Sequence, residues 1–141
     1  MLSNITYRDY IKLTDPEAIT AVVKSSGYFN DAEITLAREL AEDRLNHGLE
    51  SSYQFLFAES ASTLLGYTCY GLIPATTGSY DLYWIAVSED SRGMGLGKEL
   101  IKKTEEIIAS LGGRRIYVET SSRQQYESTR CSFDYWRPCR G

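Results

Sequence analysis

The sequence is poor in the residues that build metal sites, disulfide frameworks and membrane spans. It has one histidine and three cysteines, and Cys69, Cys131 and Cys139 show no CxxC spacing. Neither a disulfide framework nor a bound metal is therefore expected. No stretch approaches the roughly 20 apolar residues that cross a bilayer, and the amino terminus lacks a basic segment followed by an apolar run. These absences favour a reducing, cytoplasmic compartment and no membrane partner.

An excess of positive charge is also lacking. The chain has 15 Lys and Arg against 19 Asp and Glu, a formal net charge of -4. A general nucleic-acid binder needs a basic face for the phosphate backbone, so no nucleic-acid partner is expected. The length of 141 residues and the hydrophobic content of 43% suit one core, which predicts a single domain over residues 1–141.

Hydrophobic periodicity predicts one strand and two helices in the amino-terminal part, over residues 5–11, 14–26 and 30–46. The first helix carries proline in its first turn, and either Asn30 or Asp31 caps the second. The alternation of helical and strand patterns along the whole chain indicates an α/β (α+β) domain.

The remaining elements are predicted to form most of a sheet. Residues 53–58 and 64–70 are β-rich and predict a hairpin, and residues 80–87 add a third strand to an antiparallel meander. A long amphipathic helix over residues 95–111 then leads to a strand over residues 115–120. A strand reached through a helical crossover should lie parallel to its neighbour, so the sheet is mixed and mainly antiparallel.

A glycine-rich loop joins the third strand of the meander to the long helix. It reads Arg92, Gly93, Met94, Gly95, Leu96, Gly97 and Lys98. This order points several backbone N–H groups and a positive helix terminus at one place, where phosphate groups should bind. Glycine suits such a loop because it adopts positive φ and lets a phosphate approach the backbone. A helix cap alone would need only one such residue.

Two common phosphate loops do not match. A P-loop requires glycine at position 92 and Ser or Thr at position 99, where this chain has Arg92 and Glu99. A dinucleotide fingerprint requires a third glycine where Lys98 or Leu100 stands. ATP bound by that route and nicotinamide cofactors are therefore not expected.

The R-x-x-G-x-G pattern of Arg92, Gly95 and Gly97, directly after the strand of residues 82–87, resembles the acyl-CoA-binding motif of the GNAT superfamily of N-acetyltransferases. The resemblance covers residues 1–120 in order. It implies a mainly antiparallel sheet flanked by helices, with a splayed parallel strand pair. It also implies acetyl-CoA as co-substrate, no metal, and transfer to a primary amine of a small molecule or peptide.

The same resemblance assigns roles around the splay. The pantetheine arm of the cofactor would insert between the two parallel strands, held by backbone groups of Ile85, Ala86 and Val87, while residues 92–98 hold the pyrophosphate. One nearby N–H would stabilise the oxyanion formed when the amine attacks the thioester. Transfer in this family is usually direct, so the protein supplies positioning and a proton path, and Cys69 is not required as a nucleophile.

The catalytic acid and base are predicted from placement. Glu119, at the end of the parallel strand, is the candidate base; Asp81, Glu59 and a base acting through ordered water remain open, and Glu119 also suits a solvated strand end. The family's proton-donating tyrosine falls near Phe133, which has no proton to give, so Tyr126 is the candidate acid, with Tyr135 as the alternative. Nine aromatic residues suit either an acceptor pocket or the core: Tyr28, Phe29, Tyr53, Phe55, Tyr67, Tyr70, Tyr80, Tyr83 and Trp84.

Residues 121–141 depart from the family pattern. The family's final helix and closing pair of strands need more than the 21 residues that follow Thr120, so the closing hairpin is expected to be missing and the carboxyl end truncated or altered. The exposed strand edge would then be covered by the tail or by a second copy in a homodimer. The departure also leaves two alternatives to an active enzyme: a catalytically impaired acyl-CoA-binding module, and an interaction subunit with a vestigial pocket.

Overall fold

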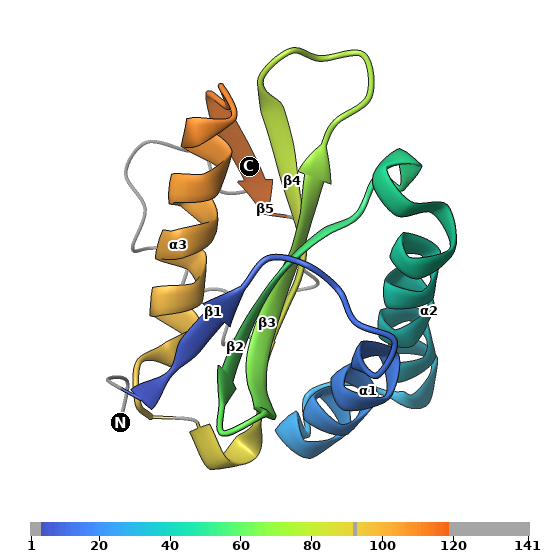
Figure 1. Cartoon of the computed structure of the whole chain (residues 1–141), viewed down its shortest axis with the longest axis vertical. Helices are drawn as coiled ribbons and strands as arrows, with labels where there is room; N and C mark the ends of the chain where they lie inside the picture. The colour runs from blue at the N-terminus through green and yellow to red at the C-terminus, as the bar shows by residue number, and fades with distance from the viewer. Residues whose placement is uncertain (1–3, 92, 119–141) are drawn as a thin grey trace.

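The computed structural model describes residues 4–91 and 93–118. They form one five-stranded sheet with helices on both faces, in the chain order β1 (Thr6–Arg8), α1 (Asp15–Ser26), α2 (Asp31–His47), β2 (Gln54–Ser60), β3 (Thr63–Leu72), β4 (Ser79–Val87), α3 (Leu96–Ser110) and β5 (Arg115–Val118). Helices α1 and α2 cover one face of the sheet and α3 covers the other (Figure 1). No helix in this described part of the chain is long and apolar enough to cross a membrane.

The sheet has the simple order β1-β2-β3-β4-β5. Strands β1 to β4 pair antiparallel with one another in chain order. Strand β5 pairs parallel with β4, from Ser79↔Arg115 to Leu82↔Val118. The chain reaches β5 through α3, as a parallel connection requires. The prediction of a mixed, mainly antiparallel sheet flanked by helices is therefore confirmed.

Local signals account for the helix ends. Asn30, one of the two predicted caps, accepts a hydrogen bond from the backbone of Glu33, and the Glu33 side chain accepts one from the Asn30 N–H. This reciprocal pair satisfies two backbone donors at the start of α2. Helix α1 ends at Gly27, which has φ of 79°. Strand β1 is shorter than predicted, because only Thr6–Arg8 pair with β2.

Two hydrophobic layers hold the helices on the sheet. Under α1 and α2, buried side chains such as Val23, Phe57 and Tyr67 form one cluster. Under α3, the predicted apolar face is buried through Leu100, Ile108 and their neighbours. The sheet is thus packed on both faces, and the carboxyl end of β4 leads directly into the glycine-rich loop that begins α3.

Candidate functional site

Strand β4 carries a β-bulge in its middle. Cys69 of β3 pairs with Trp84, but the next residue, Tyr70, pairs with Leu82, so Tyr83 is an extra residue on β4. The bulge follows immediately after Leu82↔Val118, the last described pair of the parallel ladder. A bulge bends its strand and increases the local twist. The bend therefore falls within residues 80–87, the part of β4 for which the splay from β5 is predicted.

The three residues predicted to hold the pantetheine arm follow this bulge. Ile85 and Ala86 are buried and Val87 is half-buried. They pair with Thr68, Tyr67 and Gly66 of β3. These residues pair with β3 along one edge of β4. The opposite edge of β4 pairs with β5 at residues 79–82.

The bulge also sets two successive aromatic rings against the layer formed by α1 and α2. Trp84 stacks on Phe29 of the α1–α2 loop, with ring centroids 5.1 Å apart, and Tyr83 meets the edge of Tyr53 at 5.4 Å. Burial, with a smaller contribution from Asp81, raises the pKa of Tyr83. The middle of β4 therefore packs a buried ring, Trp84, and a half-buried ring, Tyr83, beside the α1–α2 loop.

The predicted glycine-rich loop begins α3 without a side-chain cap. Gly93 and Gly95 have φ of 85° and 78°, which glycine adopts without strain, and Gly95 is the N-cap residue. The N–H of Glu99 donates to the Gly95 carbonyl at 3.1 Å. The N–H groups of the first helical turn, from Leu96 to Lys98, have no preceding helical carbonyl and are available to an anion.

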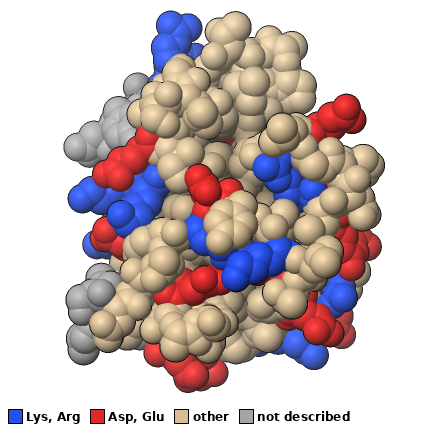
Figure 2. Space-filling view, viewed as in Figure 1, with Lys and Arg blue, Asp and Glu red and all other residues tan. Residues whose placement is uncertain are grey.

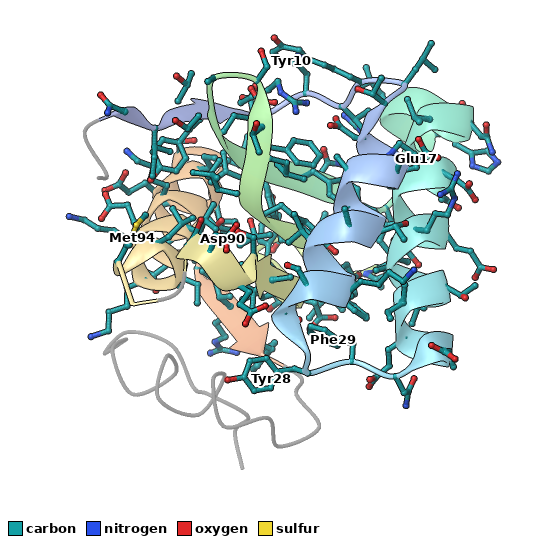
Figure 3. The ribbon with its side chains drawn as sticks, turned by 90° about the horizontal axis from the view of Figure 1, so that it is seen from below. Tyr10, Glu17, Tyr28, Phe29, Asp90 and Met94 are labelled. Carbon is teal, nitrogen blue, oxygen red and sulfur yellow. The ribbon has the colours of Figure 1, made fainter. Side chains whose placement is uncertain are left out.

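The described residues leave open space in front of this loop. Among the described residues, no atom comes within 4 Å of where a Cβ on Gly93 or Gly95 would stand. A Cβ on Gly97 would instead face inward, 3.9 Å from Cγ2 of Val87. Figure 3 shows Met94 and Asp90 at the amino-terminal end of α3, with Tyr28 and Phe29 at the end of α1. The chain thus leaves room for a phosphate group at Gly93 and Gly95, beside a helix terminus.

Several predicted site residues lie outside the described residues: Arg92, Glu119 and Tyr126. Asp81 is half-buried on β4. Glu59 lies on β2, where it accepts a hydrogen bond of 3.1 Å from Nε of Arg8. Burial alone would lower the pKa of Arg8, but hydrogen bonds to Asp15 and Glu59 raise it above its ordinary value. Glu59 is therefore part of a structural ion pair.

The nine aromatic candidates divide between core and surface. Five are buried: Phe55, Tyr67, Tyr70, Tyr80 and Trp84. Tyr28 is exposed. Sequence reasoning missed the bulge that groups Tyr83 with Trp84, because two successive aromatic residues do not reveal strand register.

The remaining reactive groups of the described chain do not form a second centre. Cys69 is fully buried, and burial raises the pKa of its thiol well above the ordinary value, so it is a poor nucleophile. Across residues 4–91 and 93–118, no three His, Cys, Asp or Glu side chains are grouped so that they could hold a metal ion.

Comparison with known proteins agrees with this geometry. The model of the acetyltransferase (GNAT) family matches residues 21–131. A solved structure of a protein assigned to the GNAT family, from Desulfovibrio desulfuricans, is 38% identical, with a TM-score of 0.84 over 91% of this chain and 80% of that one. No curated protein matches this chain by sequence.

Two more distant structures share the fold. A GNAT-family acetyltransferase from Brucella melitensis, solved in complex with acetyl-CoA, is 21% identical, with a TM-score of 0.64 over 86% of this chain and 80% of that one. The ribosomal-protein-S18-alanine N-acetyltransferase from Escherichia coli is 19% identical, with a TM-score of 0.69 over 91% of this chain and 75% of that one. The family match and the shared fold, together with the loop that begins α3, lead to one conclusion: the chain belongs to the GNAT family of acetyltransferases.

Proposed function

We propose that this protein transfers an acetyl group from acetyl-CoA directly to a primary amine of a small molecule or peptide. The observation that supports it best is the open helix start from Gly93 to Lys98, with positive φ at Gly93 and Gly95 and space in front of both. At such a helix start, backbone N–H groups and the positive end of the helix bind phosphate groups.

In this proposal the residues act by position. The loop holds the pyrophosphate, with Lys98 adding an exposed positive charge. The backbone of residues 85–87 guides the pantetheine arm along β4 toward the bulge. A backbone N–H near the bulge stabilises the oxyanion, which forms as the amine nitrogen bonds to the thioester carbon and the CoA thiolate departs. The half-buried Tyr83 then lies next to the acceptor.

Further assignments remain proposals. Glu119 is the proposed base that takes the proton of the amine, and Tyr126 the proposed acid that protonates the departing thiolate. The proposal includes no metal, nucleic acid or membrane partner, and the three scattered cysteines support a cytoplasmic setting. Association as a homodimer also stays a prediction.

The binding half of the proposal is tested by calorimetric titration with CoA. Gly95→Glu should abolish binding, because its carboxylate would occupy the phosphate position. Gly112→Glu is a matched control: Gly112 has φ of 92° and no described atom within 4 Å of its Cβ position, so the variant introduces the same charge and similar backbone strain at the opposite end of α3. Equal CoA affinity of the two variants would overturn the site.

The transfer half is tested by the release of free thiol from acetyl-CoA with a panel of primary amines. The proposal predicts thiol release with at least one amine and loss of that activity in Gly95→Glu but not in Gly112→Glu. CoA binding without thiol release from any amine would instead favour the binding module without turnover.

A further inference from the structure

A second cavity lies at the other end of β4 from the glycine-rich loop. It has a volume of about 580 Å³ and is lined by residues 75–79 of the β3–β4 loop together with Arg114 and Arg115 before and at the start of β5. Strand β4 has nine residues, so the cavity and the loop are separated by roughly 25 Å. Figure 1 shows the β3–β4 loop at one end of the sheet and the start of α3 at the opposite end. The cavity is thus distinct from the proposed CoA site.

Backbone hydrogen bonds hold the two walls of this cavity together. The carbonyl of Gly78 accepts from the N–H of Arg114 at 2.7 Å and from the N–H of Arg115 at 3.0 Å. The hydroxyl of Thr76 donates to the carbonyl of Ile73 at 2.7 Å, which closes the β3–β4 loop on itself. The loop and the turn before β5 therefore form one connected unit.

Packing against Gly78 brings the side chain of Arg114 over this loop. A Cβ on Gly78 would stand 3.3 Å from Cγ and 3.4 Å from Nε of Arg114. The stem and the first guanidinium nitrogen therefore lie directly over Gly78. Arg115 begins β5 opposite Ser79, the first pair of the parallel ladder, and so supplies the second guanidinium from the other strand.

Both guanidinium groups lack an acidic partner within the part of the chain that the structure describes. Arg8 and Arg38 each pair with carboxylates, but no described carboxylate pairs with Arg114 or Arg115, and no Asp or Glu lines the cavity. The described residues also provide no hydrogen-bond partner for the hydroxyls of Thr77 and Ser79. At the top of Figure 2, where the β3–β4 loop and the carboxyl end of α3 meet, the charged surface is basic.

We propose that this cavity binds a small-molecule phosphate monoester. Guanidinium groups match phosphate oxygens with two parallel hydrogen bonds, and the hydroxyls of Thr77 and Ser79 supply further donors. The volume exceeds what a bare phosphate fills and falls within the range of small-molecule sites, which leaves space for the organic part of the ester. The protein as a whole has a net negative charge, whereas the two arginines make this cavity locally positive. A locally positive cavity favours an anionic ligand.

The test uses the full chain saturated with dephospho-CoA, whose pyrophosphate occupies the glycine-rich loop and which, unlike CoA, carries no phosphate monoester. Glycerol 3-phosphate is titrated by calorimetry, with inorganic phosphate and sulfate as smaller anions. Glycerol 3-phosphate should bind with one site per chain and more tightly than either anion. Absence of binding in the presence of dephospho-CoA would overturn the proposal.

Variants locate the site. Arg114→Gln combined with Arg115→Gln should weaken binding at least about tenfold, as expected for lost charge-assisted hydrogen bonds. Lys12→Gln combined with Lys24→Gln removes the same charge from exposed positions that do not line the cavity, and should leave the affinity within about twofold. Equal losses in the two double variants would show a general charge effect and reject the site.

A single substitution checks the result without removing arginine. Thr77 is exposed, so Thr77→Glu should fold normally while placing a carboxylate beside the two guanidinium groups. Glycerol 3-phosphate binding should be lost, and Thr77→Gln, which has the same size without the charge, should retain most of it. Unchanged affinity in Thr77→Glu would contradict the proposal.

Discussion

The hydroxyl oxygens of Thr68 and Thr104 lie 2.7 Å apart in the core between β3 and α3. Thr104 also donates to the carbonyl of Leu100 at 2.8 Å, so its proton is already used and Thr68 is the donor to Thr104. Both threonines are buried. This pair ties the helix that begins with the glycine-rich loop to the strand beside β4.

The direction of this hydrogen bond predicts unequal effects of two similar variants. Thr104→Val should lower the free energy of unfolding by about 1–3 kcal/mol, because it leaves the buried Thr68 hydroxyl without an acceptor. Thr68→Val should have a smaller effect, since Thr104 still donates to Leu100. Urea unfolding of both single variants and the double variant measures this, and losses that simply add would show that the two hydroxyls are not coupled.

A buried ion pair should contribute far more to folding than an exposed one. Arg8 donates to both carboxylate oxygens of Asp15, at 2.7 and 3.0 Å, and its guanidinium lies 4.4 Å from the ring centre of Phe57. Asp15→Ala should lower the free energy of unfolding by about 3–5 kcal/mol, because it leaves the guanidinium charge buried with one partner fewer.

The pair of Arg38 and Glu42 on α2 is the matched comparison. Its side chains are 41% and 44% exposed, so Glu42→Ala should change the free energy of unfolding by less than about 1 kcal/mol. Denaturant titration of both variants gives the two values. Similar losses in Asp15→Ala and Glu42→Ala would show that burial does not strengthen the Arg8 network.

The helices, the buried face of α3 and the conformation of the glycine-rich loop were predictable because each depends on residues close together in the sequence. The capping box of Asn30 and Glu33 spans three residues, and the glycines predict the positive φ found at Gly93 and Gly95. The sheet order followed from the meander and the helical crossover. The family resemblance therefore rested on local signals.

Features that depend on strand register or on distant pairs were not predictable. The bulge at Tyr83 exists only relative to β3, and Arg8 and Glu59 are 51 residues apart. The β2–β3 turn was predicted over residues 59–62, but both strands continue to a tight turn at Ala61 and Ser62, which adopt positive φ without being glycine. Residues of this type carry no strong turn signal.

The stability of the fold should fall at high pH partly through Tyr70. Burial, with a smaller contribution from Asp9, raises the pKa of Tyr70 to about 12, above its ordinary value of 10.0. The folded state therefore holds this proton more tightly than the unfolded state. The resulting stabilisation is complete below pH 10 and is lost as the pH rises from 10 to 12.

Tyr70→Phe removes this contribution and nearly preserves the shape of the side chain. The free energy of unfolding of the variant should decline less steeply above pH 10, by up to about 1.4 kcal/mol per pH unit. Below pH 10 the two proteins should show the same slope. Urea unfolding at a series of pH values tests this, and parallel curves above pH 10 would show that Tyr70 ionises equally in both states.

The glycines of the loop that begins α3 should differ in what they tolerate. A Cβ on Gly95 would point into the open volume in front of the helix start and would require φ of 78°, whereas a Cβ on Gly97 would face Val87 at an ordinary contact distance of 3.9 Å. Gly97→Ala should therefore keep CoA affinity within roughly threefold and raise the free energy of unfolding by up to about 1 kcal/mol, since alanine favours the helix.

Gly95→Ala should have the opposite effects. The left-handed backbone should lower the free energy of unfolding by about 1–2 kcal/mol. The methyl group should weaken CoA binding at least about tenfold, because it occupies the space in which the pyrophosphate approaches the N–H groups. Gly112→Ala, at φ of 92° and at the opposite end of α3 from the loop, should show a similar loss of stability with unchanged CoA affinity. If Gly95→Ala and Gly97→Ala weaken CoA equally, then the pyrophosphate does not lie on the open side of Gly95, and its position along the loop must be reassigned.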